Sequence, residues 1–309
     1  EPPGHKIPHM WLLGKMLGKL IREGQLVVTD HDGSEHCFGD PAAPPVLIRL
    51  TDSRAAFDIA RDPRMGAGEA YMDARLVVEP PHDIRDMILL VMGNANRPGA
   101  GLQAPSRVKR AIDRVASRLD QINIRSRSSN NVVHHYGLTR EFYELFLDED
   151  RMYSMAYYRD PGNTLERAQL DKKALIAAKM RLEPGMKVLD IGCGWGGFGL
   201  YLNRHYGCEV LGVSLAPDQV AFANERAEAA GVAGKVRFQL IDYRDVEGQF
   251  DRISSIGMIE HLGKTHYREY FAKTYSLLAN DGVMLTHTIG KAGPPGSTDK
   301  WARKYIFPG

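Results

Sequence analysis

Residues 188–197 read Val-Leu-Asp-Ile-Gly-Cys-Gly-Trp-Gly-Gly, an apolar strand that leads through Asp190 into a glycine-rich turn. Such a turn needs glycine because positive φ angles, and a ligand close to the main chain, both exclude a Cβ atom. Gly192-x-Gly194-x-x-Gly197 also satisfies the dinucleotide fingerprint, so the motif alone leaves a nicotinamide cofactor and S-adenosylmethionine open. Asp190, inside the strand before the glycines, favours S-adenosylmethionine. The predicted cofactor-binding residues here are Asp190, Gly192, Gly194 and Gly196.

From residue 130 onward the chain alternates strand-forming and helix-forming segments. The predicted strands are residues 187–191, 209–214, 236–242, 252–256 and 282–287. Helices are predicted between them: one over residues 217–230, opened by a proline, and an aromatic-rich one that ends at a turn formed by Asp281 and Gly282. This alternation predicts an α/β fold with a doubly wound parallel sheet.

The residues that follow each predicted strand are candidate site residues, because ligands bind beyond the carboxyl ends of the strands in such sheets. Ser214 ends the second strand, and Gln219, shortly after it, is placed to bind ribose hydroxyls. A polar residue after the third strand either binds the adenine amine or caps a helix. The residues concerned are Asp242, Tyr243 and Arg244 after the third strand, Gly257-Met258-Ile259-Glu260-His261 after the fourth, and His287-Thr288-Ile289-Gly290 at the fifth.

The composition is that of an ordinary globular protein: 309 residues, 43% hydrophobic and 25% charged, long enough for two domains. No apolar run reaches the roughly 20 residues that cross a bilayer, and we expect no secretory signal. The cysteines Cys37, Cys193 and Cys208 have neither CxxC nor zinc spacing, so we expect no disulfide framework and no metal site. These features favour the cytoplasm.

The net charge of +2 is unevenly distributed along the chain, and one segment is strongly basic. Between Arg97 and Arg127 there are eight basic residues against two acidic ones, a local balance of +6. Apolar residues recur there at helical spacing, so the basic residues occupy the opposite face of a predicted amphipathic helix. A solvated helix and a surface that meets anionic phospholipid headgroups are equal alternatives. Nucleic acid is not favoured, because no recognised binding module accompanies the segment.

The first 95 residues predict a smaller α+β domain. Helices are predicted over residues 10–22, 53–61 and 83–92, and a strand over 46–50. The apolar stripe of the first helix, interrupted by Lys15 and Lys19, fits core packing better than a membrane interface, which stays an alternative. Residues 125–131 resemble a linker. We predict a lipid- or membrane-associating domain over residues 1–128 and a cofactor-binding domain over 129–309.

Several motifs together resemble one family, the cyclopropane-fatty-acyl-phospholipid synthases and the related mycolic acid cyclopropane synthases. The motifs, in family order, are His135-Tyr136-Gly137-Leu138, Tyr153-Ser154-Met155-Ala156-Tyr157, the glycine turn, Gly257-x-x-Glu260-His261-x-Gly263 and His287-Thr288-Ile289-Gly290. Gly68-Glu69-Ala70-Tyr71-Met72-Asp73 looks like a motif of the bacterial phospholipid enzymes that the mycolic acid branch lacks. The resemblance implies a Rossmann-like class I methyltransferase sheet and selects the phospholipid branch.

The resemblance also implies a reaction: S-adenosylmethionine donates a methylene or methyl group to the double bond of an unsaturated phospholipid acyl chain, and a cyclopropane ring forms. Methylation of an alkene leaves a carbocation, which a water-free aromatic pocket would stabilise. The aromatic candidates are Tyr136, Tyr143, Phe146, Tyr153, Tyr157 and Tyr158. The resemblance implies that bicarbonate then acts as the base, held by Glu260, His287 and the amide of Ile289, and that Tyr153 and Ser154 contact the cofactor.

Two features depart from the family pattern. Met155 stands where the family has cysteine, so a side-chain role there is lost while a backbone contact to the anion survives. A methyl- or methylene-branched acyl chain is therefore an alternative product. Only 19 residues follow Gly290, although methyltransferase sheets normally end with two further strands. We expect the last strands, and the family's tyrosine ligand of the anion, to be missing from this chain.

The expected partner is unsaturated phospholipid at the inner membrane surface, with the protein peripherally associated and a homodimer left open. Three other functions stay as alternatives. A small-molecule methyltransferase would share the glycine turn but would not need the basic segment. A nicotinamide oxidoreductase would bind NAD. A lipid-binding scaffold would retain cofactor affinity without turnover.

Overall fold

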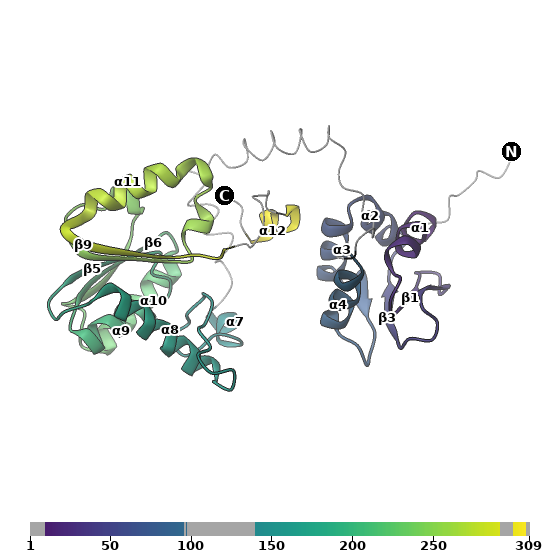
Figure 1. The fold of residues 1–309 in the computed structure, drawn as a ribbon, viewed down its shortest axis with the longest axis horizontal. Coiled ribbons are helices and arrows are strands. Elements are labelled where there is room, and N and C mark those ends of the chain that lie inside the picture. The colour runs from purple at the N-terminus through teal and green to yellow at the C-terminus, as the bar shows by residue number, and fades with distance from the viewer. Residues whose placement is uncertain (1–9, 96, 98–139, 291–298, 307–309) are drawn as a thin grey trace. The chain divides into compact units, whose positions relative to one another are not determined.

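The computed structural model describes residues 10–95, 97, 140–290 and 299–306 (Figure 1). The described residues divide into two compact units. The first unit holds residues 10–95 and 97 together with 299–304, and the second holds residues 140–290 together with 305 and 306. The predicted linker at 125–131, the first family motif at 135–138 and the basic segment apart from Arg97 lie outside the described residues.

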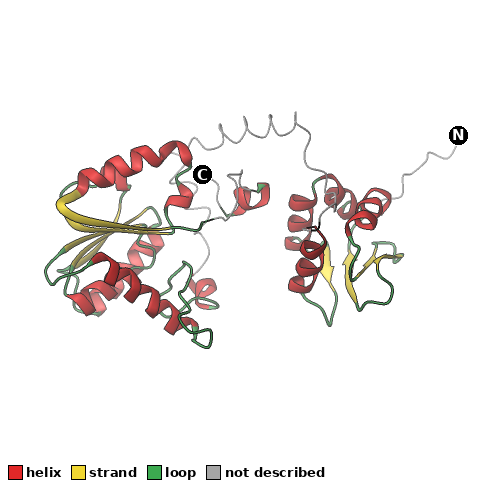
Figure 2. Ribbon diagram, viewed as in Figure 1, coloured by secondary structure: helices red, strands yellow, loops and turns green. Residues whose placement is uncertain are grey.

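The second unit is built on a parallel sheet of five strands with the order β7-β6-β5-β8-β9. Helices cover both of its faces: Figure 1 shows α11 on one face and α8, α9 and α10 on the other, and Figure 2 shows the strands between these layers. The strands are β5 (Lys187–Ile191), β6 (Glu209–Ser214), β7 (Val236–Leu240), β8 (Phe250–Ile256) and β9 (Leu278–His287); the helices are α8 (Leu165–Met180), α9 (Gly197–Tyr206), α10 (Pro217–Ala229) and α11 (Tyr267–Leu277). The predicted doubly wound α/β fold is confirmed.

The central strand β5 explains why this sheet forms. Its residues from Val188 to Ile191 are all buried, as expected for a parallel strand with helices on both faces. The strand order reverses between β5 and β8, because β6 and β7 extend the sheet on one side of β5 while β8 and β9 extend it on the other. A crevice at the carboxyl ends of the strands is expected at such a switch point.

One predicted turn is wrong. Asp281 and Gly282 lie inside β9, which begins four residues earlier than the predicted strand. The pairing of β9 with β8 shifts between Phe250 opposite Leu278 and Arg252 opposite Val283. This irregularity takes up the extra residues of β9, so the Asp-Gly pair belongs to a strand irregularity of the kind that glycine often marks, and not to a turn.

The first unit contains a mixed sheet with the order β2-β1-β3-β4, in which β1 and β3 are parallel and the outer pairs are antiparallel. Sequence patterns predicted β3, α1, α2 and α4, with ends that differ by a few residues, but missed the other four elements. The elements are β1 (Gln25–Thr29), β2 (Glu35–Gly39), β3 (Pro45–Leu50), β4 (Leu76–Val78), α1 (Met10–Leu20), α2 (Ala55–Arg61), α3 (Pro63–Met72) and α4 (Ile84–Ala95).

Helix α1 packs into the core of this unit. Met10, Leu13, Leu17 and Leu20 are buried at helical spacing, which agrees with the core-packing interpretation. The opposite side of the helix exposes Trp11 to 55%. No helix in the described part of the chain has the length and apolar character needed to span a membrane.

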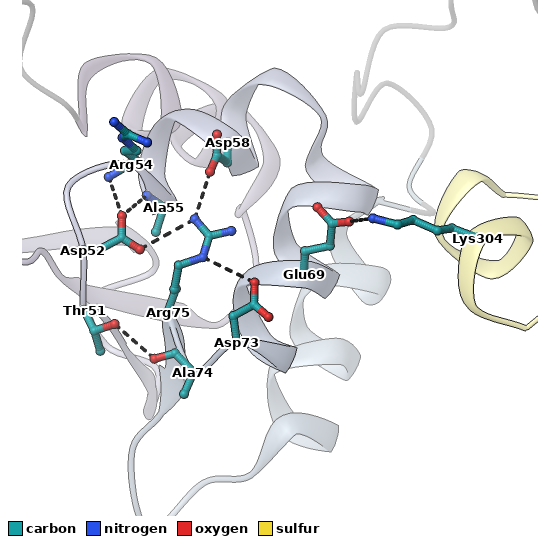
Figure 3. A network of polar contacts seen from close by, with 10 residues as sticks. All are labelled: Thr51, Asp52, Arg54, Ala55, Asp58, Glu69, Asp73, Ala74, Arg75 and Lys304. Atoms are coloured by element: carbon teal, nitrogen blue, oxygen red, sulfur yellow. Dashed lines mark hydrogen bonds and ion pairs between the residues drawn. The ribbon is translucent and has the colours of Figure 1, made fainter. Parts of the chain in front are cut away.

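Arg75 holds the polar side of the first unit together (Figure 3). Its guanidinium lies 2.9 Å from Asp58 and pairs more loosely with Asp52 and Asp73, at 3.6 and 3.7 Å. Asp52 also accepts the backbone N–H groups that open α2, at 2.6 Å from Arg54 and 3.1 Å from the next residue. One arginine therefore connects the start of α2 with the end of α3.

The motif at residues 68–73 lies on α3, against helix α12 (Lys300–Tyr305) from the far end of the chain. Glu69 accepts a hydrogen bond from Lys304 Nζ at 2.5 Å (Figure 3). A Cβ atom on Gly68 would come within 2.6 Å of the Trp301 indole, so only glycine permits this approach. Two segments more than 200 residues apart in sequence thus pack together within the first unit.

Candidate cofactor and anion sites

A cavity of about 190 Å³ lies at the carboxyl ends of the strands of the second unit. Its lining brings together residues from β5, β6 and β8, from the loop before α8 and from the segment after β7. Ten of the predicted cofactor-binding residues line it: Tyr153, Ser154, Asp190, Gly192, Gly194, Ser214, Gln219, Asp242, Tyr243 and Arg244.

The glycines of the turn have two different roles: some line the cavity and one allows close packing of helices. Gly192, Gly194 and Gly196 have φ angles of 79, 52 and 80°, which favour glycine. Gly192 and Gly194 line the cavity, whereas Gly196 does not. A Cβ atom on Gly196 would lie 2.7 Å from the Cβ of Ala223, so this glycine lets α10 pack against the start of α9.

Asp190 lies beneath the turn, 3% exposed, at the end of β5. Ser254 Oγ on β8 donates a hydrogen bond of 2.7 Å to its carboxylate. Burial raises the pKa of Asp190 to about 6, and the hydrogen bond from Ser254 opposes that rise. A buried carboxylate with one hydroxyl partner is suited to a cationic group of a ligand, because a nearby positive charge would stabilise its ionised form.

Asp242 serves as a cap as well as a cavity residue. It accepts the backbone N–H of Arg244 at 3.0 Å and the Nε–H of the same residue at 2.9 Å. The prediction that a polar residue after this strand caps a helix is therefore confirmed for Asp242. The same hydrogen bonds fix its carboxylate at the cavity wall. Gln219 is buried in the first turn of α10, also at the wall.

The loop that carries Tyr153 and Ser154 is held by an ion network that sequence reasoning missed. Asp150 pairs with Lys173 of α8 and Arg226 of α10. Gly197 lies against this network, because a Cβ atom there would approach the carbonyl oxygen of Asp150 to 2.7 Å. In the sequence, each of these charged residues resembles an ordinary solvated side chain, so no local pattern predicts the ion network.

Aromatic and cationic side chains surround the same loop. Tyr143 is 1% exposed and makes edge contacts with Tyr153 and Trp195, with ring centroids 5.5 Å apart in both pairs. Arg151, another residue that the sequence did not indicate, lines the cavity with its guanidinium 4.1 Å from the ring centroid of Phe222. Tyr143 is thus a core residue, and of the aromatic candidates only Tyr153 lines this cavity in the described chain.

Of the predicted anion-binding residues, Met155 and His287 line a second cavity of about 540 Å³, together with Tyr157 and Lys172 among others, whereas Glu260 and Ile289 do not line it. The amide of Ile289 donates a hydrogen bond of 2.8 Å to Glu260 Oε1. Among the described residues, Glu260 Oε2 and His287 Nδ1 are buried without a hydrogen-bond partner. Burial lowers the pKa of His287, and the charge of Lys172 lowers it further.

A small oxyanion that carries one proton has the groups to satisfy each of these two atoms. Bicarbonate could donate its O–H to a carboxylate oxygen and accept from an imidazole N–H, which satisfies both groups. Met155, at 64% exposed, offers no polar side-chain atom to such an anion. A metal is not indicated here, since no cluster of His, Cys, Asp or Glu in the described ranges could hold one.

Comparison with known proteins identifies the family. Residues 124–309 match the family model described as mycolic acid cyclopropane synthetase. The chain belongs to this family. It is 36% identical over 264 residues to the cyclopropane-fatty-acyl-phospholipid synthase of Escherichia coli, an alignment that covers 85% of this chain and 66% of the relative. The chain therefore spans just under two thirds of that relative's length.

Solved structures of cyclopropane synthases share the fold of this chain over about half of its length. The cyclopropane synthase MmaA2 from Mycobacterium tuberculosis is 36% identical, with a TM-score of 0.51 over 52% of this chain and 56% of that one. The mycolic acid cyclopropane synthase CmaA1, complexed with SAH and CTAB, is also 36% identical, with a TM-score of 0.50 over 51% and 55%. The predicted class I methyltransferase fold is confirmed.

The buried carboxyl of Asp190 predicts a pH dependence of stability. Between its ordinary pKa near 3.8 and about 6, the folded protein holds a proton that the unfolded chain has released, so stability falls as pH rises through this range. Asp190→Asn removes this loss. We expect the variant to gain up to about 3 kcal/mol relative to wild type between pH 4 and 7.

Urea titrations followed through the amide NMR signals of β5 and β8 measure this difference. Asp251→Asn is the matched control, because that carboxylate lies at the opposite end of β8 and accepts from the exposed amide of Lys187. A constant difference between Asp190→Asn and wild type from pH 4 to pH 7 would contradict the prediction.

Proposed function

We propose that this protein transfers a methyl carbon from S-adenosylmethionine to the double bond of an unsaturated phospholipid acyl chain, and that the resulting carbocation loses a proton to bound bicarbonate to give a cyclopropane ring. One observation supports this reaction above all others. Among the described residues, Glu260 and His287 each keep a buried polar atom without a hydrogen-bond partner, the other oxygen of Glu260 accepts from the Ile289 amide, and His287 lines the second cavity. Family membership supports the same reaction.

The first cavity is the proposed cofactor site. S-adenosylmethionine supplies an electrophilic methyl group when bound. Asp190 would offer its carboxylate to a cationic group of the cofactor, and the free N–H groups at the start of α9 would meet its polar atoms. Gln219 and Asp242 are placed on the wall to hold the ribose and the adenine amine. The relative CmaA1, complexed with SAH, supports this assignment.

The second group of residues is the proposed anion site. Bicarbonate, when bound, supplies the base that removes a proton from the transferred methyl group. Glu260 is fixed by the Ile289 amide, so its free oxygen can share a proton with an anion without moving. His287 offers a buried Nδ1 that has no hydrogen-bond partner among the described residues, and its lowered pKa keeps the ring neutral.

A methyl- or methylene-branched product is the second candidate. Met155 favours it, because its apolar side chain lines the cavity that His287 also lines. A bulky thioether at this place would displace the base from the transferred methyl group, so that the cation loses a proton from another position and a branched alkene forms instead of a ring. Ring closure therefore requires the anion to be held in place, whereas branching follows when it is not. Methyl transfer from the cofactor is the same in both cases.

Peripheral association with the inner membrane surface completes the proposal. The outer side of α1 exposes Trp11 and Leu12 together with Lys15 and Lys19. Aromatic and apolar residues beside lysines suit the boundary between headgroups and acyl chains. The ammonium of Lys15 lies 5.3 Å from the Trp11 ring centroid, so charge and ring form one surface.

Product analysis tests the reaction. The protein is incubated with methyl-labelled S-adenosylmethionine and vesicles of unsaturated phospholipid, and the acyl chains are weighed before and after catalytic hydrogenation. A chain heavier by one CH₂ that resists hydrogenation is the expected result. A reducible product would establish the methyl- or methylene-branched alternative, in which the cation loses a proton to leave an alkene, and no labelled lipid would refute the whole proposal. The same mixture with a saturated phospholipid is the control.

Glu260→Gln tests the anion site. The amide keeps the shape of the carboxylate but lacks its charge and its capacity to share a proton. We expect the turnover rate to fall by about 10² or more, the scale of a lost proton-transfer group, while the affinity for S-adenosylhomocysteine stays within about twofold. Glu247→Gln, at an exposed loop position, is the control and should retain wild-type turnover. Equal turnover of both variants would show that Glu260 has no chemical role.

Replacing the exposed apolar pair of α1 tests membrane association. Trp11→Ser with Leu12→Ser removes the apolar surface while leaving the buried stripe of α1 intact. We expect cosedimentation with anionic phospholipid vesicles to fall at least about fivefold, because burial of such side chains drives interfacial binding. Phe57→Ser, an exposed aromatic position on α2, should retain binding. Loss of binding in the control alone would place the membrane surface elsewhere.

A further inference from the structure

Lys172 is a buried cation that the proposed mechanism leaves unused. It lies on α8 and is 3% exposed, although lysine is rarely buried without an acidic partner. Its Nζ donates a hydrogen bond of 2.7 Å to Ser154 Oγ and lies 3.5 Å from the carbonyl oxygen of the same residue. Neither atom carries a charge, and within the described part of the chain Lys172 makes no ion pair.

The next residue shows what a structural lysine looks like in the same helix. Lys173 is also buried, but its ammonium pairs directly with Asp150. Asp148 is the acid whose charge acts on Lys172, but it makes no contact within ion-pair distance and its carboxylate accepts the backbone amide of Met152 at 2.7 Å. The charge of Lys172 is therefore not neutralised by contact, and burial lowers its pKa to about 8.

Lys172 lies near one residue of the proposed anion site, because its charge lowers the pKa of His287. It lines the second cavity together with His287 and Met155, and its hydrogen-bond partner Ser154 lines the cofactor cavity on the other side. The ammonium is thus held in the wall between the two cavities. Lys179, two turns along α8, lines the same cavity from an exposed position.

The charges around this site do not balance without Lys172. Glu260 contributes a carboxylate with one oxygen unpartnered. His287 contributes no charge at neutral pH, because burial, Lys172 and Lys179 all lower its pKa and only Glu260 opposes them. An incoming monoanion would meet a like charge beside a neutral ring, which is unfavourable unless a cation lies close by.

We propose that the buried ammonium of Lys172 provides the positive charge that holds the anion at the Glu260–His287 site, and that His287 binds there as a neutral hydrogen-bond donor. Lys172 is then a positioning residue, since it anchors Ser154 on the cofactor side and acts on the anion through its charge. This inference rests on the proposed function for the identity of the anion, but its electrostatic part concerns the protein alone.

The test compares Lys172→Met with Lys179→Met by NMR titration of the His287 ring in protein freed of carbon dioxide. We expect Lys172→Met to raise the pKa of His287 toward its ordinary value of 6.5. Lys179→Met should shift it much less, because the charge of an exposed lysine is screened by water and salt. An unchanged titration in Lys172→Met, or equal shifts in both variants, would overturn the inference. Lys172→Arg, which keeps the charge, should keep the pKa of His287 low.

Bicarbonate alone is the probe for the second measurement. Binding of ¹³C-bicarbonate should weaken by about tenfold or more in Lys172→Met and by less than about twofold in Lys179→Met, as expected for a buried against an exposed charge. If Lys172→Met does not fold, the pH dependence of bicarbonate binding to the wild-type protein tests the role of Lys172 instead. Its bicarbonate affinity should fall as pH rises through about 8, where Lys172 loses its proton, and a flat profile from pH 7 to 9 would refute the role.

These measurements distinguish failure of the proposed reaction from failure of the proposed role of Lys172. Lysine-dependent bicarbonate binding without any lipid product would sustain the role of Lys172 and refute the proposed reaction. A cyclopropane product with bicarbonate binding that ignores Lys172 would sustain the reaction and refute the role.

Discussion

The parallel pairing of β5 with its two neighbours is the constraint on which the rest of the site depends. Asp190 stands opposite Gly212 on β6 and opposite Ser254 on β8. Ser254 donates a hydrogen bond to the Asp190 carboxylate. Gly212 leaves space for the Phe238 ring, because a Cβ atom on Gly212 would come within 2.4 Å of that ring. A register shift of one residue would turn Asp190 to the other face, so the glycine turn, the carboxylate and its partner are fixed together.

Charge inside the second unit follows from the same geometry. Helix α8 buries two adjacent lysines, which is costly unless each charge is compensated. Lys173 is compensated by Asp150, and that network with Arg226 holds the loop that reaches the cofactor cavity. Among the described residues, Lys172 has only neutral hydrogen-bond partners, and it lines the second cavity. Neighbouring lysines in one helix therefore differ in their partners: Lys173 is paired with an acid that belongs to a loop, and Lys172 is the residue that we propose to hold an anion.

The sequence predicted the strong elements of the fold well and the weak ones poorly. The strands at 187–191 and 209–214 were predicted to the residue, because buried parallel strands are continuous apolar runs bounded by clear turn signals. The hairpin of β1 and β2 was missed, although Asp32 and Gly33 form a recognisable hairpin signal between short strands. The start of β9 was misplaced because an Asp-Gly pair marks a turn and a strand irregularity equally well, and only the pairing with β8 distinguishes them.

By itself the sequence determined the alternation of strands and helices, the glycine turn and the polar residues at the strand ends, because these depend on local backbone preferences and hydrophobic period. Asp190, Glu260 and His287 are therefore recognisable as candidate site residues in the sequence alone. Only the tertiary structure decided that Gly196 serves packing, that Glu260 is held by the Ile289 amide, and that Lys172 is buried without an ion pair to any described residue. These are properties of pairs of residues distant in sequence, and the energy of a buried charge depends on which partners the fold brings to it.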